Sequence, residues 1–392
     1  MSERILVLNC GSSSIKFALF DAAGTPLPRR PEWSGKINGI GSGEASLDES
    51  DRPSQPLELD AVQPYHDALR CIRTRVLARL GDARLAAVAH RVVHGGSKYS
   101  QPVRVDAAVL DDLHHYIPLA PLHQPFALEA IGTLLRERPD IPQVACFDTA
   151  FHHTLPEVEK LLPLPWDAWQ RGLRRYGFHG LSYEYLSIAL RERLGDRARG
   201  RTICAHLGSG ASLCAMQDLR SVATTMGFSA LDGLMMGTRC GSLDPGALLY
   251  LMQIEKLGVD EVAALLYHDS GLLGVSGISP DPRVLFPREA TDERARLALA
   301  LYVRRIVRET GALVATLGGL DLLAFTAGIG EHNAEVRSRV CRELGWLGVE
   351  LDAAANADGA AVISTRASRV LVVVEPTNEE WIAARSAAQM GS

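Results

Sequence analysis

Two short turns of small residues are the stretches of this 392-residue sequence best suited to bind an anion. The first turn, Gly11–Ser14, follows the apolar run Ile5–Leu8 and Asn9, and an alternating apolar stretch comes after it. Small residues leave backbone N–H groups and hydroxyls open to a phosphate, and Lys16 adds a positive charge just beyond the turn. The pattern predicts a β-hairpin over Ile5–Phe20 whose turn binds an anion; an ordinary hairpin is the alternative.

The second turn, Gly208–Ser212, lies between two apolar stretches within residues 203–216, about half the chain length after the first. A strand, a small turn and a strand at this spacing predict a duplicated fold with one phosphate-binding turn in each half. The sequence has no Gly-x-x-x-x-Gly-Lys-[Ser/Thr] motif, and no Gly-x-Gly-x-x-Gly links a strand to a helix. A P-loop NTPase and a nicotinamide-binding Rossmann domain are therefore disfavoured.

Two arginines lie where a guanidinium can reach an anionic ligand. Arg91 is flanked by His90 and His94 at an expected strand end, and Arg239 lies within the glycine-containing segment Gly237–Gly241. An arginine in such a loop can bind a carboxylate or a phosphate with two parallel hydrogen bonds. A structural ion pair explains many single arginines, but two in loops of this kind favour anion binding.

Other candidates have weaker individual signals. Asp148 follows an expected strand, at the edge where open α/β sheets place ligand groups; a loop-capping aspartate is the alternative. His179 precedes an expected helix and could be a structural histidine, and Glu379 could be an ordinary acid of a first helical turn. Gly328–Gly330 could pass close to a ligand or form a strand-to-helix corner.

The elements expected to hold these residues alternate between strand and helix, which predicts an α/β fold. Strands are expected at 86–89, 143–147, 203–216 (a hairpin), 322–326 and 370–375. Helices are expected at 65–80, 107–116, 126–138, 182–194 with Ser182 as N-cap, 246–257, 259–267, 292–317 and 379–389. Residues 48–56 and 271–283 are expected to be loops.

Composition limits the class of protein. Hydrophobic residues make up 47% and charged residues 22%, as in ordinary globular proteins, and the length suits two domains. The net charge of −5 gives no indication of nucleic-acid binding. Seven scattered cysteines without a Cys-x-x-Cys pair indicate reduced thiols, and no signal peptide or membrane-spanning run is found. We therefore expect a cytoplasmic protein without nucleic-acid or membrane partners.

Six motifs together resemble those of the acetate kinases. They run in the family's order along essentially the whole chain: NCGSSSIKF at 9–17, HRVVHGG at 90–96, FDTAFH at 147–152, YGFHG at 176–180, MMGTR at 235–239 and AGIGE at 327–331. The family belongs to the acetate and sugar kinase, heat-shock 70 and actin superfamily. The resemblance implies two duplicated actin-like, ribonuclease H-like α/β domains with a central nucleotide cleft. They are expected at 1–149 with 375–392, and at 150–374, the second binding nucleotide and dimerising.

The resemblance also implies roles for individual residues. Asp148, His179 and Arg239 would be catalytic, Arg91, Val93 and Leu122 would bind the substrate, and Asn9 and Glu379 would bind Mg²⁺, with Mn²⁺ as a substitute. ATP or ADP would be bound by Lys16, Ser12, Ser14, His206, Leu207, Gly208, Ser209, Gly210, Asp281, Pro282, Arg283, Gly328, Ile329, Gly330, Glu331 and His332.

The activity implied is reversible, Mg²⁺-dependent phosphoryl transfer between ATP and acetate in a homodimer. A propionate kinase is the nearest alternative, because one methylene in an acyl pocket is hard to judge from sequence. An actin-like ATPase or an inactive ATP-binding scaffold is a more distant one, since neither needs two arginines for a small acid. The sequence departs from the family pattern at four positions, namely Ser209, Ala230, Ser242 and His332.

Overall fold

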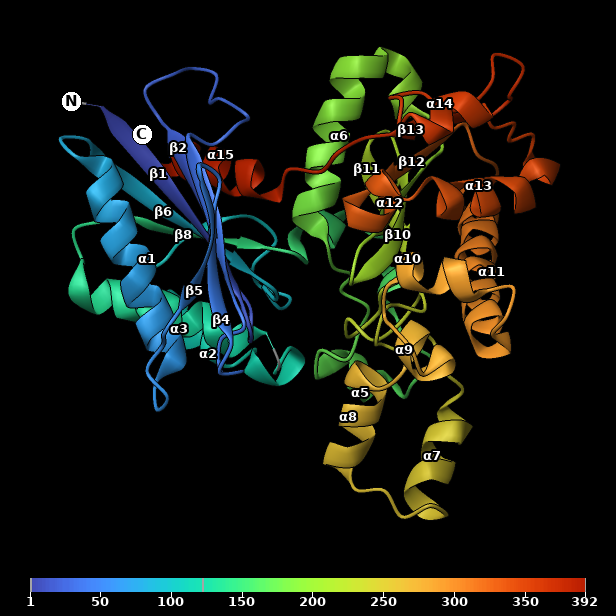
Figure 1. Ribbon diagram of the computed structural model, residues 1–392, viewed down its shortest axis with the longest axis horizontal. Helices are drawn as coiled ribbons and strands as arrows, with labels where there is room; N and C mark the ends of the chain where they lie inside the picture. Colours follow the sequence, from blue (N-terminus) through green and yellow to red (C-terminus); the bar gives the residue numbers. More distant parts are fainter. Residues whose placement is uncertain (1, 122, 392) are drawn as a thin grey trace. The chain divides into compact units, whose positions relative to one another are not determined.

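The computed structural model describes residues 2–121 and 123–391 (Figure 1). Contacts divide the chain into two compact units, Met1–Ala150 with Asn378–Ser392 (unit 1) and Phe151–Thr377 (unit 2). Within the described part, no helix has the length and apolar character needed to cross a membrane.

Unit 1 is built on a mixed sheet in which β1 is central. The strand order across the described residues is β5-β4-β3-β2-β1-β6-β8-β7. β1 to β5 pair antiparallel, whereas β1, β6 and β8 are parallel. Their bounds are β1 Glu3–Cys10, β2 Ile15–Asp21, β3 Trp33–Asn38, β4 Ala45–Glu49, β5 Arg52–Leu57, β6 Arg84–Val92, β7 Val103–Arg104 and β8 Gln143–Phe147.

Helices cover both faces of this sheet. α1 (Pro64–Leu80) and α3 (Gln124–Glu137) pack on the face that carries Leu6 and Leu8, with α2 (Ala107–His114) beside α3. α15 (Glu379–Gly391) packs against β1, β6 and β8, and the Sγ atom of Cys146 in β8 lies 4.0 Å from the carbonyl oxygen of Ala383 (Figure 1). Alternating apolar residues thus give β1 two buried faces, and the last helix of the chain belongs to the first unit.

Unit 2 repeats the central pattern of unit 1. Its sheet has the order β11-β10-β9-β12-β13 among the described residues, with two antiparallel pairs followed by two parallel pairs. The segment β3-β2-β1-β6-β8 has the same sequence of directions. The duplicated α/β fold is therefore confirmed. The bounds are β9 Thr202–Leu207, β10 Ala211–Gln217, β11 Arg220–Thr224, β12 Leu322–Thr326 and β13 Leu371–Val374.

The two principal helices of unit 2 are α6 and α11. Tyr183, Leu186 and Leu190 of α6 pack on the β9–β10–β12 core, and α11 packs against β10 (Figure 1). The helical bounds are α4 Glu157–Lys160, α5 Trp166–Gln170, α6 Gly180–Leu194, α7 Pro245–Gln253, α8 Val259–His268, α9 Gly271–Ser276, α10 Pro282–Leu285, α11 Glu293–Leu317, α12 Ala327–His332, α13 Ala334–Glu343 and α14 Ala353–Ala357. Asp292 caps α11 by accepting a hydrogen bond from the backbone N–H of Ala295.

Two segments expected to be loops contain regular structure. Residues 48–56 include the end of β4 and most of β5, which lies at the edge of the sheet and pairs only with β4 among the described strands. β5 contains Pro53 and Pro56, which have no backbone N–H group. An edge strand tolerates proline because one of its sides forms no hydrogen bonds within the sheet, and the two prolines made the sequence resemble a loop. Residues 271–283 contain α9 and the start of α10, which are too short to show helical periodicity.

Candidate active site

Strand register brings three predicted residues of unit 1 into one row. Asn9 of β1 lies opposite Lys16 of β2 in the antiparallel pair and opposite Arg91 of β6 in the parallel pair. Directly opposed residues project from the same face of a sheet, here the face on which α15 packs. The Nη1 atom of Arg91 donates a hydrogen bond of 3.1 Å to Oδ1 of Asn9. A lysine, an amide and an arginine therefore line one end of this sheet.

Arg91 is held by Asp148, which follows the neighbouring strand β8. Nε of Arg91 lies 3.0 and 3.1 Å from the two carboxylate oxygens, and Nη2 lies 2.5 Å from Oδ2. The carboxylate is buried, and the backbone N–H of Asp148 donates to the carbonyl of Val92, which extends the pairing of β8 with β6. Burial lowers the pKa of Arg91, but the charges of Asp148 and Glu379 outweigh this and raise it. The three contacts fix the guanidinium against both carboxylate oxygens.

Glu379, the first residue of α15, adds a carboxylate near the same arginine. Burial, together with the charges of Asp148 and Glu380, raises the pKa of Glu379 to about 7, although Arg91 and Lys16 act in the opposite direction. Glu379 thus has cationic as well as anionic neighbours, and its carboxylate and the Asn9 amide offer oxygens of the kind that Mg²⁺ prefers. Across residues 2–121 and 123–391 no group of three or more His, Cys, Asp or Glu side chains could hold a metal ion. Glu379 and Asn9 fit Mg²⁺ that keeps waters or binds phosphate oxygens as well.

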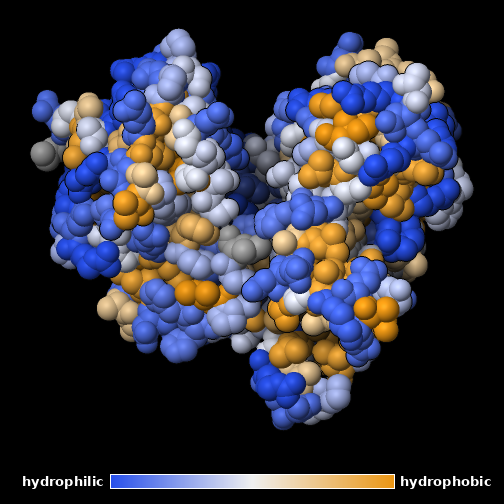
Figure 2. All heavy atoms as spheres, turned by 60° about the horizontal axis from the view of Figure 1, so that its bottom comes forward, coloured by the Kyte–Doolittle hydropathy of each residue, from blue (hydrophilic) through white to orange (hydrophobic). Residues whose placement is uncertain are grey.

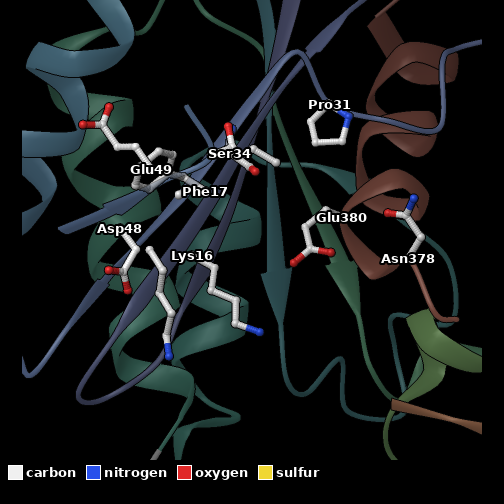
Figure 3. Close-up of a pocket in the computed structure, with 12 residues that line it drawn as sticks. Lys16, Phe17, Pro31, Ser34, Asp48, Glu49, Asn378 and Glu380 are labelled. Carbon is white, nitrogen blue, oxygen red and sulfur yellow. The ribbon is translucent and has the colours of Figure 1, made fainter. Parts of the chain in front are cut away.

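A pocket of about 440 Å³ adjoins this row and contains residues that the sequence did not single out (Figure 3). Lys36 of β3 lies opposite Lys16 in one strand pair and opposite Asp48 of β4 in the next. Asn378 and Glu380 line the other side of the pocket, at the start of α15. Burial lowers the pKa of Lys36, and the neighbouring charge of Lys16 adds to that effect. Only the β2–β3 register would have identified the second lysine.

In unit 2, the second glycine turn brings together His179 and Arg239. Gly208 donates its backbone N–H to the carbonyl of Gly210 at 3.0 Å, which closes the turn between β9 and β10. A Cβ atom at Gly210 would lie 3.2 Å from Nε2 of His179 and 3.6 Å from Nη1 of Arg239. A side chain here would crowd His179 and contact Arg239, so glycine at this position lets both side chains approach the turn closely.

His179 is fixed by its backbone and by two neighbours. It precedes α6 in the left-handed region, with a φ of 60°, and its Nδ1 lies 2.8 Å from Oγ of Ser212. Its ring stacks on His206, with centroids 4.1 Å apart. Ser182 is not the N-cap of this helix, because the residue lies within α6. Its hydroxyl contacts Nδ1 of His206 and Oγ1 of Thr377, both at 2.8 Å.

Arg239 lies in a loop without helix or strand and is half-buried. Its Nη1 donates a hydrogen bond of 3.1 Å to the carbonyl of Ala230, one of the positions that departs from the family pattern. Ser242, another such position, contacts Oδ1 of Asp232 at 2.7 Å and accepts a hydrogen bond from the N–H of Gly233. The serine therefore supports the loop that presents Arg239.

The predicted nucleoside segment starts beside the same turn. A Cβ atom at Gly208 would lie 3.7 Å from that of Ala327, the first residue of α12. Gly328–Gly330 are helical, so the strand-to-helix corner lies at Thr326 and Ala327, where Ala327 has a φ of 64°. Oε1 of Glu331 accepts hydrogen bonds from the N–H groups of Ala327 and Thr377. This carboxylate therefore holds α12 to the segment before α15.

The remaining predicted residues are more scattered. Asp281 caps α10 and forms an ion pair with Arg283, while His332 is exposed at the end of α12. Ser12 and Ser14 lie in the first hairpin turn, which the N–H of Gly11 closes on the carbonyl of Ser14 at 2.9 Å. Val93 is half-buried just after β6, and Leu122 lies outside the described residues. The binding roles of these residues stay predictions.

Acid is expected to destabilise the protein through three buried histidines that lie beside the site residues. Burial lowers the pKa of His90 to about 4, of His94 to about 3 and of His152 to about 4. In the unfolded chain a histidine has a pKa of about 6.5, so below that pH these histidines bind protons in the unfolded chain but stay neutral in the folded one. The free energy of unfolding therefore falls as the pH drops toward 4.

The variant His90→Gln tests this directly. Between pH 7.5 and pH 5, His90 alone should account for about 2 kcal/mol of the lost free energy of unfolding, which the variant would not lose. Urea unfolding at the two pH values measures the difference. His114→Gln, at an exposed histidine of α2, is the matched control and should behave as the wild type. An equal pH dependence in wild type and His90→Gln would contradict the prediction.

The architecture and the two sets of polar groups define a phosphotransferase of the actin-like α/β class. Each unit repeats one strand order, and each has a small turn at the end of a β-hairpin beside fixed basic side chains. A model of the acetokinase family matches residues 4–385. The chain belongs to the acetokinase family.

Comparison with known proteins gives the same family. The acetate kinase of Rhodopseudomonas palustris is 49% identical over 390 residues, which cover 98% of either chain. The crystal structure of a propionate kinase from Francisella tularensis superposes with a TM-score of 0.91 at 34% identity, covering 98% of both chains. For an acetate kinase from Porphyromonas gingivalis the TM-score is 0.85 at 36% identity, covering 97% of this chain and 98% of that one. The predicted family, fold class and phosphotransferase class are confirmed.

Proposed function

We propose that this protein is an acetate kinase, which catalyses the reversible transfer of a phosphoryl group between ATP and acetate with Mg²⁺. Family membership supports the reaction type. The observation that carries the proposal is the arginine held by a buried aspartate in the row Lys16–Asn9–Arg91. A fixed guanidinium beside a lysine suits two anions that must react, a small carboxylate and a phosphate.

The residues act mainly by position and charge. In phosphoryl transfer, negative charge spreads over the oxygens of the transferred group, and fixed donors that meet this charge lower the barrier. In this proposal Arg91 orients the acetate, Lys16 binds a phosphate, and His179 and Arg239 stabilise the transferring group. The glycine turns and α12 bind the nucleotide. Asn9 and Glu379 would hold Mg²⁺, which supplies positive charge to phosphate oxygens when bound.

The acceptor needs no general base. A carboxylic acid with a pKa of about 4 to 5 is already ionised at pH 7, so its oxygen can attack the phosphorus directly. The new bond joins a carboxylate oxygen to phosphorus, the bond from phosphorus to the bridging oxygen of ATP breaks, and ADP leaves with that electron pair. Asp148 therefore acts by orienting Arg91, which it contacts through both oxygens.

Trapping of the acyl phosphate tests the proposal and its alternatives. The protein is incubated with ATP, Mg²⁺ and hydroxylamine together with acetate, propionate or butyrate, and the acyl hydroxamate is measured. We expect the highest kcat/KM with acetate. A higher value with propionate would favour a propionate kinase, the activity named for the Francisella tularensis protein. ADP release without any hydroxamate would favour an ATPase and contradict the proposal.

We also propose a homodimer formed through unit 2 and a cytoplasmic location. Leu249 and Tyr250 of α7 are 54% exposed, Ile254 just after α7 is 62% exposed, and Val259 at the start of α8 is 71% exposed. Figure 2 shows apolar side chains at the molecular surface among polar ones. α7 and α8 contact each other, and several large apolar side chains exposed on neighbouring helices favour an interface with another protein. Analytical ultracentrifugation should give a dimer, and Ile254→Asp should give a monomer.

The cysteines support the proposed cytoplasmic location. None of the seven cysteines forms a disulfide, which suits a reducing compartment.

A further inference from the structure

Unit 1 contains a cavity of about 960 Å³ whose lining includes none of the described residues predicted for the reaction. It lies under the sheet face that α1 and α3 cover. Its floor consists of Leu6 and Leu8 of β1 with Val88 of β6, all buried side chains. Its walls are apolar side chains of the two helices, among them Leu69, Ile72, Val76, Ala130 and Leu134.

The cavity lies between α1 and α3, which pack together through aromatic side chains at one end and are connected by an ion pair at the other. Near their N-termini the rings of Tyr65 and Phe126 are 5.1 Å apart, and the Tyr65 hydroxyl donates to the carbonyl of Phe126 at 3.3 Å. Toward their C-termini, Arg73 of α1 forms an ion pair with Glu137 of α3 at the mouth of the cavity. Leucines of both helices therefore stay half-buried where packed helices would bury them.

The cavity is separate from the row of site residues. It opens at the amino ends of the strands, where Glu3, Arg84 and Pro142 contribute to its lining. Asn9 and Arg91 lie toward the carboxyl ends of β1 and β6. Six residues of extended β1 place Glu3 about 20 Å from Asn9.

Four ion pairs lie around the mouth of the cavity. Arg73 pairs with Glu137, Arg84 with Glu3, and Arg138 with Asp140. Arg70 pairs with Asp67 of its own helix. The four arginines of the lining thus have carboxylate partners, and the floor offers apolar groups alone. The lining also includes the exposed side chains of His66 and Asp82. A charged ligand seated over the apolar floor would lose its hydration and gain no counter-charge there, so the chemistry selects an uncharged one.

We propose that this cavity is a binding site for an uncharged, largely apolar small molecule. Its volume lies within the range of about 300 to 1,000 Å³ that is typical of small-molecule sites. Burial of an apolar ligand here removes apolar surface from water without breaking the ion pairs of the mouth. The site is independent of the proposed phosphoryl transfer, and its ligand need resemble neither ATP nor a short carboxylate.

The test uses N-phenyl-1-naphthylamine, an uncharged probe whose emission rises in apolar surroundings. Titration of the wild-type protein should show saturable binding of one probe per chain. Leu134→Trp and Leu69→Trp fill the cavity from either wall and should each weaken binding at least tenfold. Glu129→Trp, on an exposed position of α3 outside the cavity, is the matched control and should bind the probe as the wild type does.

Hydrogen exchange of the wild type gives a second measurement that needs no variant. The probe should slow amide exchange within 64–80 and 124–137, the residues of the two wall helices. Non-saturable binding, equal binding by the filled variants, or protection confined to the exposed apolar surface of α7 and α8 would overturn the proposal.

Discussion

Asp148→Asn is expected to lower kcat for acetyl phosphate formation by a factor of about 100 or more, equally at pH values between 8 and 9, above the pKa of Glu379. Asp148 holds Arg91 through three contacts that use both carboxylate oxygens. An asparagine has one acceptor oxygen and turns an NH₂ group toward the guanidinium, so Arg91 loses its fixed orientation. The expected effect is large because the arginine must be in place before the phosphoryl group moves.

The absence of a pH effect follows from the chemistry of the acceptor. Acetate is ionised throughout this range, and no proton has to leave it for the reaction to occur. Hydroxamate formation at several pH values measures the loss. Asp140→Asn disrupts a similar two-pronged pair with Arg138 on the exposed surface and should leave kcat unchanged. A defect of Asp148→Asn that disappears at high pH would indicate proton transfer by Asp148 and contradict this mechanism.

Arg337→Met is expected to lower the free energy of unfolding of unit 2 by about 3 to 5 kcal/mol, because each buried acceptor left without a donor costs about 1 to 3 kcal/mol. Arg337 is fully buried in α13. Its Nη1 donates to the carbonyls of Gly330 and Glu331 at 2.9 and 2.7 Å, and Nε and Nη2 donate to Asn356 at 2.8 and 2.7 Å. Methionine fills similar space but satisfies none of these acceptors.

The same change should weaken nucleotide binding, because Arg337 fixes the carbonyls at the end of α12. We expect the KM for ATP to rise severalfold while the KM for acetate stays the same. Urea unfolding and initial rates measure the two effects. Arg342→Met lies on the same helix at an exposed position and should change stability by no more than about 0.5 kcal/mol. Equal stability of the two variants would show that Arg337 is not the support described here.

Signals carried by neighbouring residues could be interpreted correctly without the structure. The first hairpin is one example, since its strands alternate in polarity and a turn of small residues joins them. The strand Gln143–Phe147 is another, and so are the helices with clear caps. The half-length spacing of the two glycine turns already indicated that β1–β2 and β9–β10 are equivalent hairpins. Each of these patterns either lies within about 20 consecutive residues or is a local pattern that occurs twice in the chain.

Contacts between distant segments depended on the tertiary structure. Arg91 meets Asn9 across 82 residues of sequence and Asp148 across 57, and strand register decides both contacts. Register also placed Lys36 beside Lys16, and helix packing placed Arg337 under α12. A one-residue shift in register would turn these side chains to the opposite face, and no local pattern records that choice. The sequence by itself determined the two turns of small residues and the residue types predicted for the site, whereas only the tertiary structure decided which of those residues lie together.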